Sequence, residues 1–203
     1  MTGTDPTDAE HAEKKARIKA ARDRMMADKT QTKGLLIVHT GKGKGKSSSA
    51  FGMVMRCLGH GMRVGIVQFI KGAWETGEAR FLARFPDEVT IKTMGEGFTW
   101  ETQDRARDVA AAERAWTAAS AMLADHNFAM VVLDELNVVL RYDYLPLATI
   151  LAGLAGRPAG QHVVVTGRNA PAALIDAADL VTEMTLVKHP FRDGIKAQPG
   201  VEF

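Results

Sequence analysis

The feature that most constrains this chain is a glycine- and lysine-rich run that directly follows an apolar segment. The apolar segment is Leu35 to Val38, and the run reads T-G-K-G-K-G-K-S-S from Thr40 to Ser48. Glycines at alternate positions let the backbone turn tightly and direct several amide N–H groups toward one point, at the start of a helix predicted near Gly45. A loop of this kind between a strand and a helix is typical of phosphate binding. The alternative, a flexible basic surface loop, is disfavoured by those flanking patterns.

The residue types within the loop predict specific roles. Lys46 would bring a positive charge to the phosphates, and Ser47 a hydroxyl group to a bound Mg²⁺. The usual eight-residue pattern begins with glycine, whereas this chain has Thr40 at that position. The predicted nucleotide-binding residues of the loop are Gly41, Lys42, Gly43, Lys44, Gly45, Lys46, Ser47 and Ser48.

The length of 203 residues suits one domain with appendages. Twenty-six Lys and Arg residues against 24 Asp and Glu residues give a net charge of +2, which predicts no general attraction to nucleic acid or membranes. The single cysteine, Cys57, excludes an intramolecular disulfide and is expected to be a small buried apolar residue. The N-terminus lacks an apolar signal-type core, so a cytoplasmic protein is expected.

The chain divides by composition into residues 1–33 and residues 34–203. The first part has almost no large aliphatic residues but good helix formers from Asp8 to Met26, which predicts a mobile segment with a conditional helix. A solvated tail without function is the alternative. In the second part, short β-branched runs alternate with helix-like stretches, which predicts an α/β fold of the phosphate-loop NTPase (RecA-like) type, with a mostly parallel sheet and helices on both faces. Strands are predicted at 35–38, 64–70, 89–93, 128–133, 162–166 and 180–186, and helices at 46–59, 76–84, 101–125, 146–155 and 170–177.

Two carboxylates follow the most apolar of these strands. Asp134 and Glu135 directly follow residues 128–133, at the carboxyl end of the strand, where a parallel sheet presents its ligand-binding residues. In phosphate-loop proteins such a carboxylate orders Mg²⁺, so both residues are candidate metal ligands together with Ser47. Either carboxylate could instead cap the following segment, and the sequence does not distinguish which of the two contacts the ion.

Further segments narrow the chemistry. Phe98 and Trp100 lie two residues apart, so in an extended segment both rings project on the same side. Such an aromatic pair is more often part of a core than a platform for a ligand. Gln68 to Gly72 and Thr166 to Arg168 follow two other predicted strands and reach the same edge of the sheet.

Taken together, these motifs resemble the ATP:corrinoid adenosyltransferases of the phosphate-loop class. The resemblance covers nearly all of residues 33–203. It is most specific in the combination of the phosphate loop with G-F-T-W-E-T-Q at 97–103, and it extends to R-Y-D-Y-L at 141–145 and V-K-H-P-F at 187–191. The serine-rich loop and Arg168-Asn169 are most similar to the aerobic branch of cobalamin synthesis. Lys42 departs from the family pattern, since other branches carry a small polar residue there.

The resemblance implies a reaction and roles for particular residues. The family transfers the 5′-deoxyadenosyl group of ATP to the Co(I) centre of a corrinoid and releases triphosphate. It implies that Lys46, Ser47 and Glu135 act on the nucleotide, that Arg56 contacts it, and that Phe98 and Trp100 cover the lower corrin face and keep the cobalt without an axial ligand. Reduced corrinoid, ATP with Mg²⁺, a flavin-type electron donor and a homodimer are implied as well. Whether the corrinoid is cobyrinic acid a,c-diamide, cobinamide or cobalamin is left open.

Two other functions fit parts of the same pattern. A RecA-like ATPase or kinase would use Glu135 to orient water and would release ADP, and the loop and the acidic strand end fit it equally well. A corrinoid carrier without catalysis would not need an intact loop lysine, serine and carboxylate pair. Adenosyl transfer is therefore the predicted function.

Overall fold

The computed structural model describes residues 7–70, 76–94 and 104–202 and forms two compact units, residues 1–32 and 33–203. In the first unit, helix α1 spans Asp8–Ala27 and begins with a capping box, in which Thr7 and Glu10 bond each other's backbone amides. None of the residues of α1 is buried. Capping and helix propensity, rather than packing, therefore favour this helix. That the segment is mobile and helical only under some conditions stays a prediction.

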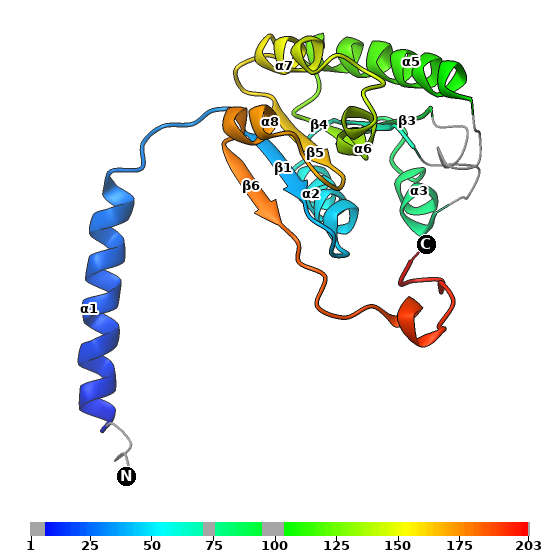
Figure 1. The fold of residues 1–203 in the computed structure, drawn as a ribbon. Helices are drawn as coiled ribbons and strands as arrows, with labels where there is room; N and C mark the ends of the chain where they lie inside the picture. Colours follow the sequence, from blue (N-terminus) through cyan, green and yellow to red (C-terminus); the bar gives the residue numbers. More distant parts are fainter. Residues whose placement is uncertain (1–6, 71–75, 95–103, 203) are drawn as a thin grey trace. The chain divides into compact units, whose positions relative to one another are not determined.

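The second unit is built on a six-stranded sheet in which every pairing is parallel (Figure 1). The strand order is β3-β2-β4-β5-β1-β6. Because all strands run the same way, their carboxyl ends meet at one edge, where ligands bind in folds of this class. The strands are β1 (Leu36–Thr40), β2 (Val64–Gln68), β3 (Val89–Thr93), β4 (Met130–Asp134), β5 (His162–Thr166) and β6 (Leu180–Glu183).

Helices cover both faces of this sheet. Helix α2 (Lys46–Gly59) packs on β1, β2, β4 and β5 from one side, and α3 (Gly77–Leu82) contributes Leu82 to the same core. On the other side, α5 (Arg105–Ala124) packs on β2, β3 and β4 and against α7, as Figure 1 shows. That side also carries α6 (Leu136–Arg141), α7 (Leu147–Ala155) and α8 (Ala172–Ala177), and a 3₁₀ helix, η1 (Pro190–Asp193), follows β6.

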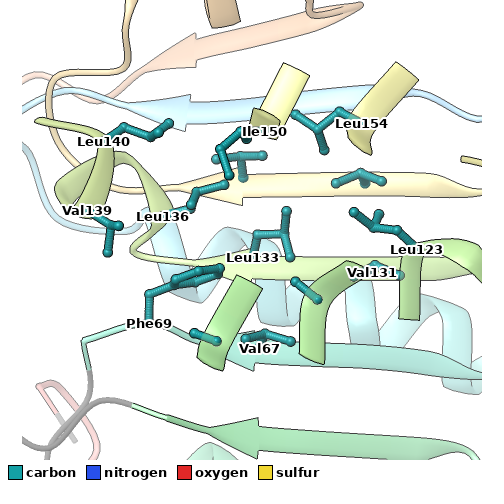
Figure 2. Close-up of a cluster of buried hydrophobic side chains, with 14 of the residues drawn as sticks. Val67, Phe69, Leu123, Val131, Leu133, Leu136, Val139, Leu140, Ile150 and Leu154 are labelled. Atoms are coloured by element: carbon teal, nitrogen blue, oxygen red, sulfur yellow. The ribbon is translucent and has the colours of Figure 1, made fainter. Parts of the chain in front are cut away.

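Each face of the sheet has its own apolar core, because side chains alternate along a strand. In β1, Ile37 faces the α2 side, whereas Leu36 and Val38 face the opposite side. Figure 2 shows the larger core, in which side chains of α5, α6 and α7 meet those of β2 and β4. Burying one Leu, Ile or Val side chain contributes about 1.5–3 kcal/mol, so these two layers dominate the stability of the unit.

The predicted α/β architecture is confirmed. Strands β3 and β5 and helix α2 have the predicted bounds, and the other predicted elements are present with ends shifted by a few residues. The sequence does not predict helix α6, because it is only six residues long and begins one residue after β4, with Glu135 alone between them. Cys57 is buried as expected, and burial raises the pKa of its thiol. No helix among the described residues has the length and apolar character needed to span a bilayer.

Candidate active site at the phosphate loop

A cavity of about 360 Å³ lies at the carboxyl edge of the sheet, beside the glycine- and lysine-rich loop. Its walls come from parts of the chain that are far apart in sequence. They are the loop itself (Gly43 to Ser48), the start of α3 (Thr76 to Glu78), Glu135 after β4, Arg168 after β5, and the C-terminal residues Gly200 to Glu202. We call this space the loop cavity.

The loop connects β1 to α2 as predicted, and its glycines are required by packing as well as by backbone conformation. Gly41 and Gly45 have φ angles of +94° and +104°, in the left-handed region that favours glycine. A Cβ atom on Gly43 would lie 2.7 Å from the carbonyl oxygens of both Met184 and Thr185, which follow β6. The amide of Gly43 donates to the Met184 carbonyl at 2.7 Å. The Gly43 amide is thus used within the fold, so the amides of Lys44 to Ser48 are the loop amides that we assign to a phosphate ligand.

Lys46 lines the loop cavity and is 7% exposed. Its ammonium group donates to the carbonyl oxygen of Gly43 within the loop. Burial lowers the pKa of Lys46, and the Glu135 carboxylate opposes this shift. The nearby cations Arg168 and Lys44 lower the pKa further. Several cations therefore share one site, and a polyanion bound there would stabilise all of them.

The side chain of His39 contacts the backbone at the end of the same loop. It is buried on β1, and its Nδ1 lies 3.3 Å from the carbonyl oxygen of Lys46, so the ring donates a hydrogen bond to the first turn of α2 in the matching tautomer. Burial lowers the pKa of His39, and the hydrogen bond to Lys46 opposes that shift. The neutral imidazole thus helps to hold the backbone that carries the loop lysine.

The two predicted carboxylates have different environments. Asp134 is fully buried, and its side chain accepts hydrogen bonds from the Thr166 hydroxyl at 2.8 Å and from the Gln68 amide at 3.4 Å. Glu135 lines the loop cavity, and its φ of 64° places it in the left-handed region, which is unusual for a residue other than glycine. Its amide donates to the Thr166 hydroxyl at 2.9 Å. Glu135 therefore presents its carboxylate to the cavity, while Asp134 belongs to the supporting structure.

The supporting structure is a chain of polar side chains across the carboxyl edge of the sheet. The Thr93 hydroxyl on β3 donates to Gln68 on β2 at 3.0 Å, and Gln68 in turn bonds Asp134 on β4. Thr166 on β5 completes the chain. These four side chains connect four neighbouring strands, and they fix the strand ends from which Glu135 and Arg168 reach the cavity.

The sequence pattern predicts that Arg168 reaches the edge of the sheet and assigns it no further role. It follows Gly167, where a Cβ atom would lie 2.9 Å from Cβ of Asn137 and 3.2 Å from Oε2 of Glu135. Asn137 donates from Nδ2 to the Gly167 carbonyl at 3.0 Å. The Asn137 bond holds the turn after β5, and the absence of a side chain at Gly167 lets this turn lie close to Asn137 and Glu135. Arg168 thereby lines the loop cavity together with Lys44 and Lys46.

The structure does not bring every predicted residue to the loop cavity. Gly41 and Lys42 line a second cavity of about 490 Å³ beside the segment after β6. Arg56 lies exposed in the last turn of α2 and does not line the loop cavity. Phe98 and Trp100 lie outside the described residues.

The donors around the loop cavity fit a magnesium ion that is shared with phosphates. Mg²⁺ typically takes one or two carboxylates together with substrate phosphate oxygens. Ser47 and Glu135 offer a hydroxyl and a carboxylate on the cavity wall. In the part of the chain that the structure describes, no three His, Cys, Asp or Glu side chains gather closely enough to hold a metal.

Comparisons with known proteins identify the family of this chain. The family model described as ATP:corrinoid adenosyltransferase BtuR/CobO/CobP matches residues 32–203. A corrinoid adenosyltransferase of Pseudomonas aeruginosa is 59% identical over the full length of both chains. One from a Sinorhizobium species is 58% identical over 97% of this chain and 92% of its own, and the corrinoid adenosyltransferase CobA of Salmonella typhimurium is 44% identical over 97% and 100%.

Among solved structures, the RadB recombinase matches with a TM-score of 0.45 and 15% identity over 78% of each chain. The family match spans the whole second unit, including the loop, both carboxylates and Arg168. The chain therefore belongs to the family of ATP:corrinoid adenosyltransferases.

Proposed function

We propose that this protein transfers the 5′-deoxyadenosyl group of ATP to the Co(I) centre of a corrinoid and releases inorganic triphosphate. The observation that carries the proposal is the loop cavity, in which Lys44, Lys46 and Arg168 surround a space beside a phosphate loop in a chain of this family. Three cations and a set of backbone amides suit a polyanion that leaves as one unit.

The bond changes place specific demands on the protein. Co(I) supplies an electron pair to the 5′ carbon, a cobalt–carbon bond forms, and the bond from that carbon to the triphosphate oxygen breaks. The electron pair of the broken bond leaves with the triphosphate, so negative charge develops on the oxygen that departs. Co(I) carries no proton to remove, so the step needs no general base. The protein instead needs donors for the leaving group, and we assign that role to Lys44, Lys46, Arg168 and the amides of Lys44 to Ser48.

We assign the magnesium contacts to Ser47 and Glu135. Both line the loop cavity, whereas Asp134 is buried and bonded to Thr166 and Gln68. The ion, when bound with ATP, would neutralise phosphate charge. Asp134 is proposed to act indirectly, because it fixes the strand end from which Glu135 reaches the cavity.

The remaining roles rest on the family resemblance. Phe98 and Trp100 would cover the lower face of the corrin and keep the cobalt free of an axial ligand, which makes Co(II) easier to reduce. Arg56 would contact the nucleotide. A flavin-type electron donor, a homodimer and a cytoplasmic location belong to the same proposal, as does cobyrinic acid a,c-diamide as a substrate of the aerobic branch.

Product identity tests the proposal directly. The protein is mixed with MgATP and a chemically reduced corrinoid without oxygen, and the phosphate products and the corrinoid spectrum are followed together. We expect triphosphate and a light-sensitive cobalt–carbon bond to form in equal amounts, with little ADP. ADP and phosphate that accumulate at the same rate with and without corrinoid would contradict adenosyl transfer and support an ATPase.

The variant Lys46→Ala serves as the matched control in this assay. Loss of one preorganised electrostatic contact should cost roughly 2–4 kcal/mol of transition-state stabilisation. Normal turnover in Lys46→Ala would mean that the chemistry takes place away from the loop cavity.

A further inference from the structure

The C-terminal end of the described chain returns to the phosphate loop. After β6 the backbone runs through the exposed helix η1 and then turns at Gln198, whose carbonyl accepts the amides of Val201 and Glu202 at 3.2 and 2.9 Å. Gly200, within this turn, has a φ of 79°. The turn places Gly200, Val201 and Glu202 on the wall of the loop cavity.

At this point the Glu202 carboxylate forms an ion pair with the ammonium group of Lys44. The Glu202 side chain is 18% exposed and that of Lys44 is 53% exposed, so the carboxylate lies deeper than its partner. These residues are 158 positions apart in the sequence. Lys44 is also one of the three cations to which we assigned the triphosphate.

A carboxylate in this position opposes a bound polyphosphate for two reasons. Its oxygens use ammonium donors that phosphate oxygens would otherwise take. In addition, its negative charge repels a polyanion a few ångströms away, and water screens this repulsion only partly inside a cavity. The contact and a bound triphosphate therefore compete for Lys44.

We propose that Glu202 is an internal competitor of the triphosphate, which holds Lys44 between turnovers and helps to expel the product. The inference rests on the proposed function, since it takes triphosphate as the leaving group. Binding of the polyphosphate displaces the carboxylate from Lys44, and return of the carboxylate weakens the hold of the loop on the released triphosphate. Because a surface ion pair contributes about 0.2–1 kcal/mol, the competition should change affinity about 1.5- to fivefold.

The test measures binding of sodium tripolyphosphate, without magnesium or corrinoid, by titration calorimetry of the full-length protein at low salt. We expect Glu202→Gln to bind tripolyphosphate about 1.5- to fivefold more tightly than the unchanged protein. Asp193→Asn is the matched control, because it removes a carboxylate of the same exposed segment that does not line the loop cavity. It should bind as the unchanged protein does. Thermal unfolding of each variant verifies that the fold is intact.

A double-mutant cycle with Lys44→Gln separates the ion pair from general repulsion. If Glu202 acts through Lys44, Glu202→Gln should give no tightening in the Lys44→Gln background. Equal tightening in both backgrounds would overturn the proposed competition for Lys44. Equal binding by Glu202→Gln would overturn it as well. Weaker binding would also overturn it, and would fit a carboxylate that contributes to ligand binding.

The same titration distinguishes this inference from the proposed function. If the unchanged protein does not bind tripolyphosphate, the loop cavity is not a triphosphate site and both proposals fail. If it binds tripolyphosphate and Glu202→Gln changes nothing, only the competition is overturned.

Discussion

At the scale of single residues, two glycines differ in whether their surroundings leave room for a side chain. Gly43 lies against the carbonyl oxygens of Met184 and Thr185, so a side chain there would push the loop away from the segment after β6. Gly52, in the middle of α2, has no atom within 4 Å of its would-be Cβ position. The two residues are both glycine, but only the first is required by its surroundings.

We therefore expect Gly43→Ala and Gly52→Ala to change the free energy of unfolding in opposite directions. Gly43→Ala should lower it by at least about 1 kcal/mol, because backbone atoms must move. Gly52→Ala should raise it by about 0.5–1 kcal/mol, because alanine is the better helix former and fits without a clash. Urea unfolding measures both values. Equal effects of the two variants would contradict the packing role of Gly43.

At the scale of elements, the two adjacent carboxylates at the end of β4 have different environments. Asp134 bonds its neighbours on β2 and β5, while Glu135 lines the loop cavity. We expect Asp134→Ala to lower the free energy of unfolding by about 1–3 kcal/mol, since its buried partners lose their acceptor. Glu135→Gln should leave the free energy of unfolding nearly unchanged. It should raise the activation free energy of turnover by about 2 kcal/mol or more, and a higher Mg²⁺ concentration should be needed for activity.

Denaturant unfolding and magnesium titration of activity, measured on both variants, test this division. A stable Asp134→Ala protein that requires much more Mg²⁺, together with a fully active Glu135→Gln protein, would reverse the two assignments.

The same elements show which features of this fold can be predicted from sequence. The loop, α2 and the order of strands and helices follow from local patterns of apolar spacing, and the structure confirms them. Asp134 and Glu135 were placed correctly at the end of a strand, but their different roles depend on which way each side chain points. The pairing of Lys44 with Glu202 joins residues 158 positions apart, and no local pattern encodes it. Arg168 could have been proposed from its place after a strand, next to a glycine.

At the scale of the whole molecule, the chain forms two compact units, and helix α1 belongs to the first. Helix α1 has no buried residue, and the family match begins at residue 32. We expect that deletion of residues 1–32 leaves the unfolding transition and ATP binding unchanged. It should weaken corrinoid affinity, because we predict that the segment from Asp8 to Met26 closes over the bound corrinoid and excludes water from the Co(I) site.

Hydrogen exchange of this segment, measured with and without corrinoid plus MgATP, tests the prediction directly. Slower exchange in the ternary complex would support a closing role. Equally fast exchange in both states, with full corrinoid affinity in the shortened protein, would mean that the segment is a solvated tail.

The contact between the phosphate loop and the segment after β6 has an evolutionary consequence. Because Gly43 packs on Met184 and Thr185 and also gives its amide to Met184, selection for a stable fold alone would preserve this glycine. A descendant that had lost its catalytic role would still keep much of the glycine spacing that marks a nucleotide site. Loss of Lys46, Glu135 or Arg168, whose side chains line the loop cavity, would be the earlier sign of a protein that has left this chemistry.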